Sequence, residues 1–315
     1  MKHIHIPAIA FIILIFSLTL SVNIIFAANT KPPVVVIEYA YQEAHDFHEG
    51  LAAVKQNDRW GYIDNFGRIA IPLVHKLPDA GDFSDGYAFL GDHYIDTEGN
   101  QAFSREDPDT GRIEEKFFRN GLPFSQGVAA VQSGGQWGYI DLMGDYIIAP
   151  SFERVDSFSE GLAPARKNGL WGYINIRGIF VIEPKFLRAG RFSEGIAAVN
   201  HKGRWGFINK EGKFIIRPVY HEAGDFVYGL APVRTRTSYR GWGYISLRNR
   251  FAIPRRYNIA LNFGEGLAPV AADTRFGYVN VRGEWEIAPQ FDDARPFCEG
   301  LAAVKREKKW GFIRQ

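Results

Sequence analysis

A Trp-Gly pair recurs at a nearly constant spacing along this chain, and that spacing restricts the fold to a repeat array. From Trp137 onward, the pair or its Phe-Gly equivalent returns after 34, 34, 37, 34 and 34 residues. A fixed period of this size indicates supersecondary units that bury their cores against one another. We identify eight copies of the unit. The signature pairs are Trp60-Gly61, Trp137-Gly138, Trp171-Gly172, Trp205-Gly206, Trp242-Gly243 and Trp310-Gly311, with Phe276-Gly277 as the variant pair.

Each unit carries three short segments that are rich in β-branched and aromatic residues. Examples are the Leu-Ala-Ala-Val of 51–54, the Trp-Gly-Tyr-Ile of 171–174 and the Phe-Val-Ile-Glu-Pro of 180–184. Alternation over four to six residues, without helical periodicity, predicts strands. The sequence therefore predicts an all-β fold of eight three-stranded antiparallel units, each with a proline closing its outer strand.

Two positions of the repeat carry a polar residue in most units, and each set of aligned residues is called a column here. Both columns are expected to have a structural role. Because Asp and Asn hydrogen-bond their own backbone in turns, the first column predicts hairpin turns that end in Gly, or in Asn249 once. The first column is Asp64, Asp96, Asp141, Asn175, Asn209 and Asn280, and the second is Glu49, Glu160, Glu194, Glu265 and Glu299.

The Gly that follows Trp lies in mid-strand, where it weakens a sheet unless something packs against it. We expect an aromatic ring to cover this Gly and the Trp to fill a buried slot. The candidate rings precede the Glu-Gly motif: Phe47, Phe158, Phe192, Phe263 and Phe297.

The two ends of the array predict its shape. Residues 36–39 match a third strand, whereas the chain ends at Trp310-Gly311-Phe312-Ile313, a second strand. The N-terminal strand can thus complete the last unit, as in propellers. This favours a closed propeller-like ring over the alternative, an open β-solenoid or superhelix.

Residues 1–28 differ in kind from the repeats. Lys2 precedes an apolar stretch that ends at Phe26, and Ala27-Ala28 supplies small residues. This pattern predicts a signal peptide, with an uncleaved membrane anchor as the alternative. Residues 29–315 are expected to form a single domain outside the cytoplasm: in the periplasm, on the cell surface or secreted.

Composition and motifs argue against several classes of function. The formal charge of +2 predicts no nucleic-acid partner. No catalytic or cofactor motif is present, so we expect neither a cofactor nor a catalytic residue. His45 and His48 are expected in a solvated loop rather than at a metal. Cys298 occupies a Ser position of the repeat and is expected to be unreactive.

The motif Glu-Gly-Leu-Ala-x-Val, followed by Trp-Gly-Tyr-Ile-Asp and Ile-x-Pro, resembles the bacterial WG-repeat family. The resemblance covers about residues 34–315. It implies an extracytoplasmic or surface-associated repeat module without a common catalytic motif.

Candidate functional residues are sought where the repeat is broken. The second copy has Asp92-His93 in place of Trp-Gly, and the insertion Ser104 to Arg119 follows it. The sixth copy has a longer hairpin at 234–240, and its arginines predict an anion-binding patch. The patch residues are Arg234, Arg236, Arg240, Arg255 and Arg256.

We therefore expect an exported, monomeric, non-enzymatic binding or scaffold module with an envelope protein or a glycan as partner. Membrane contact is expected only through the N-terminal segment if it is uncleaved. Two alternatives remain: a glycan hydrolase whose carboxylate pair comes from different repeats, and a purely structural surface spacer.

Overall fold

The computed structural model describes residues 32–106, 110–235 and 241–315, so the predicted signal segment lies outside the described residues. Those residues form strands and turns only, as the sequence predicts. Nothing in these ranges is a helix of the length and apolarity that crossing a membrane requires.

Thirty-two strands build the described part of the chain. The described chain begins with β1 (Val34–Tyr41), which belongs to the last sheet. The first three units and the insertion contain β2 (Glu43–Ala44), β3 (Leu51–Gln56), β4 (Arg59–Asp64), β5 (Ile69–His75), β6 (Tyr87–Leu90), β7 (His93–Asp96), β8 (Arg105–Glu106), β9 (Ile113–Glu114), β10 (Asn120–Gly121), β11 (Val128–Ser133), β12 (Gln136–Asp141) and β13 (Tyr146–Phe152). The fourth to sixth contain β14 (Arg154–Val155), β15 (Ala163–Lys167), β16 (Leu170–Ile174), β17 (Phe180–Phe186), β18 (Arg188–Ala189), β19 (Ile196–His201), β20 (Arg204–Asn209), β21 (Phe214–Tyr220), β22 (Glu222–Ala223), β23 (Leu230–Arg234), β24 (Trp242–Ser246) and β25 (Phe251–Tyr257). The last two contain β26 (Ile259–Ala260), β27 (Leu267–Ala272), β28 (Arg275–Asn280), β29 (Trp285–Phe291), β30 (Asp293–Ala294), β31 (Ala302–Arg306) and β32 (Lys309–Arg314).

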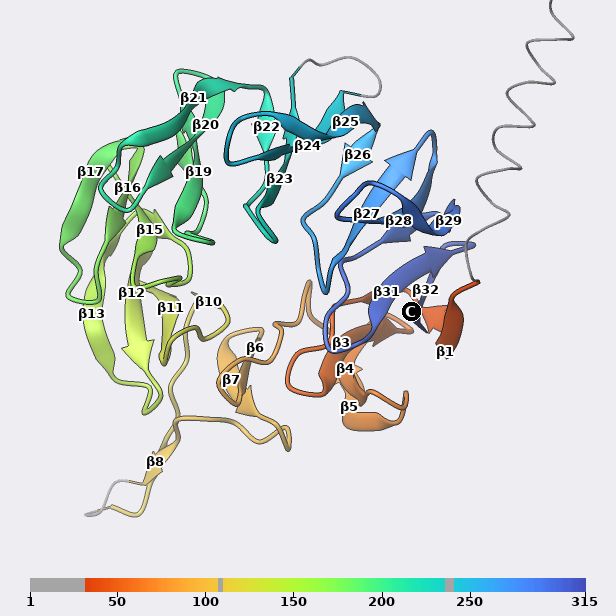
Figure 1. Ribbon diagram of the computed structural model, residues 1–315. Helices are drawn as coiled ribbons and strands as arrows, with labels where there is room; N and C mark the ends of the chain where they lie inside the picture. The colour runs from red at the N-terminus through yellow and green to blue at the C-terminus, as the bar shows by residue number, and fades with distance from the viewer. Residues whose placement is uncertain (1–31, 107–109, 236–240) are drawn as a thin grey trace, which may run out of the picture.

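These strands form a closed, propeller-like ring (Figure 1). Seven sheets have four strands, and the second unit keeps only the two strands β6 and β7. The prediction of three strands per unit is therefore wrong, because each complete unit has four. A two-residue strand, such as β14, pairs with the inner side of each complete unit, and it is too short to give a periodic pattern.

The ring is closed as the two chain ends predict. Strand β1 pairs antiparallel with β32, with Ile37 opposite Phe312, and so supplies the outer strand of the last sheet. The alternative of an open solenoid is wrong for this chain. The prolines lie on outer strands such as β5 and β17, where a missing N–H costs no ladder hydrogen bond.

The aromatic residue after Trp-Gly is the principal core residue at each interface between units. Tyr173, for example, is fully buried, and its ring lies against Phe192 of the next unit. The same contact, with ring centroids 4.8 to 5.2 Å apart, recurs at all eight interfaces. The Tyr173 hydroxyl also donates a hydrogen bond to the Gly190 carbonyl at 2.8 Å. The phenylalanines therefore join neighbouring units.

The Gly of the Trp-Gly pair faces a neighbouring backbone, so the predicted aromatic cover is wrong. A β-carbon on Gly172 would lie 2.3 Å from the carbonyl oxygen of Ile182. The ladder between β16 and β17 shifts register at this point, and this brings the outer strand against the Gly. The equivalent distance in the other pairs is at most 2.8 Å.

The tryptophans are not uniformly buried, which corrects the expectation that each fills a core slot. Trp60 and Trp310 are buried, as is the variant residue Phe276. Four consecutive units instead leave their tryptophans partly exposed: Trp137, Trp171, Trp205 and Trp242.

The repeated polar columns are structural, as predicted. The first stabilises turns, and the second links neighbouring units, a role that the sequence did not predict. Asn175 accepts hydrogen bonds from the N–H groups of Arg177 and Ile179 in its own turn. Each Glu of the second column adopts a positive φ, 53° at Glu160, and its carboxylate accepts the N–H of the next unit's Gly, here Gly195 at 3.0 Å. Asn249 has a φ of 56°, as its turn requires.

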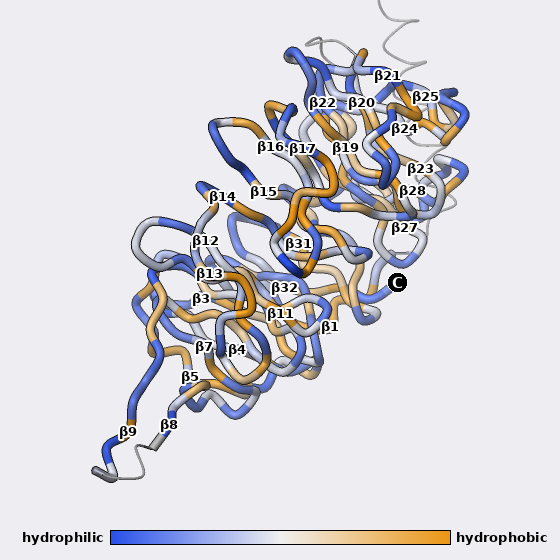
Figure 2. Tube along the Cα trace, turned by 90° about the vertical axis from the view of Figure 1, so that its left-hand side faces the viewer, coloured by the Kyte–Doolittle hydropathy of each residue, from blue (hydrophilic) through white to orange (hydrophobic). Residues whose placement is uncertain are grey.

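The insertion after the second unit protrudes from the ring, as the sequence predicts (Figures 1 and 2). It also contains the short hairpin β8–β9, in which Arg105 pairs with Glu114. Lys116 ties the base of this arm to the third unit through the Gly144 carbonyl and Asp145.

Candidate functional site

Five successive units contribute to one central cavity of about 320 Å³. Its lining includes His48 of the first unit, Asp82 of the second, Ser125 of the third, Asp156 of the fourth and Arg191 of the fifth. All of these side chains lie in the segment just before the glycine turn of their unit, which reads Glu-Gly in the first, fourth and fifth units, Asp-Gly in the second and Gln-Gly in the third. Because the residue type at these positions varies from unit to unit, the cavity is chemically irregular within a regular frame.

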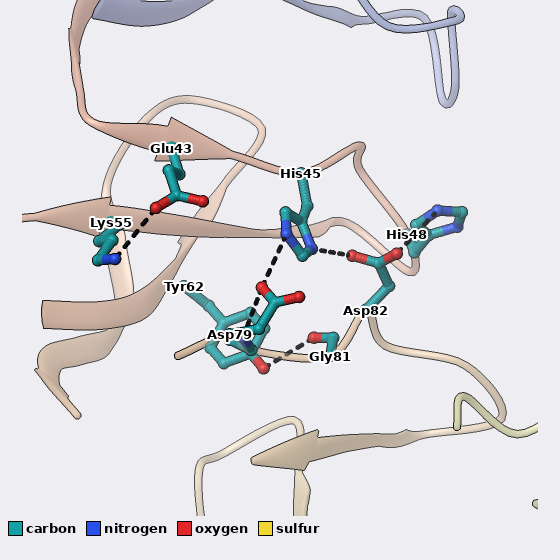
Figure 3. A network of polar contacts seen from close by, with 9 residues as sticks. Glu43, His45, His48, Lys55, Tyr62, Asp79, Gly81 and Asp82 are labelled. Carbon is teal, nitrogen blue, oxygen red and sulfur yellow. Dashed lines mark hydrogen bonds and ion pairs between the residues drawn. The ribbon is translucent and has the colours of Figure 1, made fainter. Parts of the chain in front are cut away.

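A histidine between two carboxylates forms the densest polar cluster beside this cavity (Figure 3). The Nε2 atom of His45 lies 3.2 Å from Asp79, and its Nδ1 atom lies 2.8 Å from Asp82. Burial lowers the pKa of His45, but the hydrogen bonds to the two aspartates outweigh it and raise that pKa to about 9. His45 is therefore a partly buried imidazolium, and its predicted place in a solvated loop is wrong.

A further carboxyl group, the half-buried Asp46, adjoins this cluster. Burial raises its pKa to about 6, although the positive charge of Arg295 opposes the shift. Its Oδ1 atom is buried without a hydrogen-bond partner. A partly buried acid of this kind is costly to ionise and is typical of functional positions.

Cys298 lies in the Ser position of the Glu-Gly turn, as predicted. The pair Cys298 and Leu301 forms the same bridge as Ser159 and Leu162. Its Sγ atom is 4.0 Å from Nδ1 of His48. Burial, followed by the charges of Asp46 and Glu299, raises the pKa of this thiol to about 11.

The predicted arginine patch is only partly within the described residues, because Arg236 and Arg240 lie outside them. Arg234 pairs with Glu222 and lies over the Trp242 ring. Arg255 donates a hydrogen bond to Thr235 at 2.8 Å. Arg256 instead donates hydrogen bonds to the Gly283 carbonyl and to the hydroxyl of Tyr257. The described arginines thus have internal partners, and their anion binding stays a prediction.

Sequence reasoning missed the central cluster because its members come from different units. Asp79 and Asp82 are 34 and 37 residues from His45, and neither belongs to a repeated column. The only available indication was His45 itself, at a position where the other units carry other residue types. The described ranges contain no group of three or more His, Cys, Asp or Glu residues suited to a metal ion.

The closed ring of β-sheets and its central cavity define a propeller-like repeat protein. The chain belongs to the WG containing repeat family, whose model matches it at residues 34–60, 60–90, 137–171, 171–205, 205–236, 242–272 and 276–310. No functionally curated protein matches the sequence.

Solved structures are similar in fold. One, described as the eukaryotic initiation factor, has 11% identity and a TM-score of 0.54, over 87% of this chain and 84% of that chain. Hsv2 from Kluyvelomyces marxianus has 9% identity and a TM-score of 0.48, over 88% and 98%. The extracellular domain of the two-component system BT4673 from B. thetaiotaomicron has 12% identity and a TM-score of 0.45, over 86% and 44%. At these identities the likeness concerns the fold alone.

Proposed function

We propose that this chain is an exported, monomeric, non-enzymatic binding module whose ring holds an envelope protein or a glycan. The observation that carries the proposal is that repeated and unrepeated polar side chains lie in different places. Repeated ones, such as Asn175 and Glu160, are used in turns and between units. Unrepeated ones, such as Asp82 and Arg191, line the central cavity. A regular frame with an irregular lining suits selective binding.

A location outside the cytoplasm rests on the N-terminal segment. Residues 1–28 combine a basic start, an apolar stretch and small residues before the repeats. With a single cysteine, the fold needs no disulfide in either compartment. Cell fractionation, with an antibody against the repeat domain, tests this location directly.

Capture from native envelope extracts tests the binding function. Wild-type protein is expected to retain a partner or to bind on a glycan array, and the double variant Asp82→Asn, Arg191→Ala is expected to lose it. Arg217→Ala, at an exposed position on the outer strand β21, is the matched control. A second variant, with Arg234, Arg236 and Arg240 changed to Ala, tests the arginine hairpin. Equal capture by every variant would assign binding to another surface.

One observation favours a hydrolase as the second candidate function. Burial raises the pKa of Asp46 to about 6, and Asp82 of the next unit is near enough to contribute to this shift. A protonated acid near a carboxylate is the arrangement that glycoside hydrolysis uses. Release of reducing sugar from envelope glycans by the wild type, but not by Asp46→Asn, would replace the binding proposal with this one.

A further inference from the structure

The four partly exposed tryptophans lie on the opposite face of the ring from the Glu-Gly turns. In the fourth unit, strand β15 runs from the Glu160-Gly161 turn to the hairpin at 168–169, and Trp171 pairs with Arg166 at that hairpin end. Equivalent pairing places Trp137 opposite Gln132 and Trp205 opposite Asn200. The tryptophans therefore follow one another from unit to unit on this face.

Two adjoining grooves run between these units. A groove of about 600 Å³ lies between Trp137 and Trp171, and one of about 570 Å³ lies between Trp171 and Trp205. Both grooves include Trp171 and Arg154, so they are continuous. Among the described residues, none hydrogen-bonds to the indole N–H of these three tryptophans. Each ring can therefore offer both an apolar face and a free donor.

The second groove carries positive charge that the protein neutralises incompletely. Arg154 lies directly opposite Arg166 in the ladder, an arrangement of like charges that destabilises a sheet. The Nε atom of Arg166 is buried without a hydrogen bond and lies 3.6 Å from the carboxylate of Glu153. Within the described ranges, Arg154 and Arg188 have no ion-pair partner. The second groove is lined by the guanidinium groups of Arg154, Arg166 and Arg188 and by one carboxylate, Asp156. With Glu153 beside Arg166, three guanidinium groups face two carboxylates. Asp156 also pairs with Arg191 outside this groove.

We propose that this tryptophan face binds an acidic polysaccharide chain, with sugar rings on Trp137, Trp171 and Trp205 and their carboxylates on Arg154, Arg166 and Arg188. Indole rings take up the apolar face of a pyranose, while guanidinium groups hold carboxylates in bidentate fashion. Continuity across three units suits a linear polymer rather than a single small ligand. This inference rests on the proposed binding function and names the ligand class of a second face.

Binding of a galacturonate oligomer, with a neutral galactose oligomer of equal length as comparison, tests the proposal. We expect calorimetry and tryptophan fluorescence to detect the acidic oligomer and not the neutral one. Affinity is expected to fall with added salt because exposed charges are screened. Trp171→Ala and Arg188→Ala are each expected to weaken binding about tenfold, which corresponds to about 1.4 kcal/mol.

Two further variants separate recognition from folding. Trp171→Phe is expected to retain most of the affinity, because it keeps an aromatic face. Arg217→Ala, on an outer strand, is expected to bind as the wild type does. Three results would overturn the proposal: the acidic oligomer does not bind, the neutral oligomer binds equally well, or both alanine variants fold and bind the acidic oligomer with the affinity of the wild type. The two proposals can fail separately. If Trp171→Ala still captures a partner from envelope extracts while the double variant Asp82→Asn, Arg191→Ala does not, the proposed binding function holds and the proposed polysaccharide site on the tryptophan face is wrong.

Discussion

The carboxylate of Glu299 accepts a hydrogen bond from the backbone N–H of Gly50 at 2.9 Å, across the join between the two ends of the chain. Its other oxygen accepts the N–H of Glu49 at 2.7 Å. The same type of bond links Glu194 to Gly229 and Glu265 to Gly300 within the array. The join is therefore held by the polar contact that holds the other units, in addition to the β1–β32 pairing.

Replacing Glu299 by Ala is expected to lower the free energy of unfolding by about 1 kcal/mol, the usual net value of such hydrogen bonds. Hydrogen exchange at the Gly50 amide should accelerate, because its acceptor is lost. Glu211→Ala, at an exposed turn residue, is the control and should change neither quantity. Unchanged exchange at Gly50 would show that the bond does not persist in solution.

Gly172→Ala is expected to destabilise the protein by about 3 kcal/mol or more, because the added β-carbon would overlap the Ile182 carbonyl. Gly190→Ala is the control, since its β-carbon would first meet a side-chain oxygen of Asp225 at 3.3 Å. Urea unfolding of both variants measures the difference. Equal stability of the two variants would refute the close backbone approach.

His45 predicts a pH dependence of stability. Its pKa is raised from 6.5 to about 9, so its contribution is complete below pH 6.5 and is lost as the pH rises through about 9. We expect unfolding free energy to decline by up to about 3 kcal/mol over this window. His45→Gln should flatten the decline, and His221→Gln should leave it unchanged. An equally steep decline in His45→Gln would contradict the ion-pair assignment.

Cys298 is expected to alkylate slowly in the folded protein. Its pKa is raised from 9.0 to about 11 by burial and nearby carboxylates, which lowers the thiolate fraction at pH 8 about 100-fold. Mass spectrometry of iodoacetamide labelling, with the urea-unfolded protein as reference, measures this. Cys298→Ser should keep the stability of the wild type, because Ser occupies the position in other units. Equal labelling rates in the two states would contradict the assignment.

Much of the architecture follows from local patterns. The hairpin turn at Asn175, the positive φ at Asn249 and the completing strand at residues 36–39 are all predicted by residue type and offset alone. The inner two-residue strands are not, because two residues carry no periodicity. The candidate cavity is also not predictable, since His45 and Asp82 meet only when neighbouring units pack.

Residue type and spacing along the chain were enough to predict the repeat and its turns, because backbone conformation depends mainly on neighbouring residues. The closure of the ring followed from the complementary strands at residues 36–39 and 310–313. Which side of each Trp-Gly-aromatic segment is buried depends on the packing of neighbouring units. Tyr173 became the core residue because Phe192 of the next unit covers it, whereas Trp171 stayed partly exposed beside a groove. Burial depends on what a neighbouring unit places against a side chain, and one repeat read alone does not contain that information.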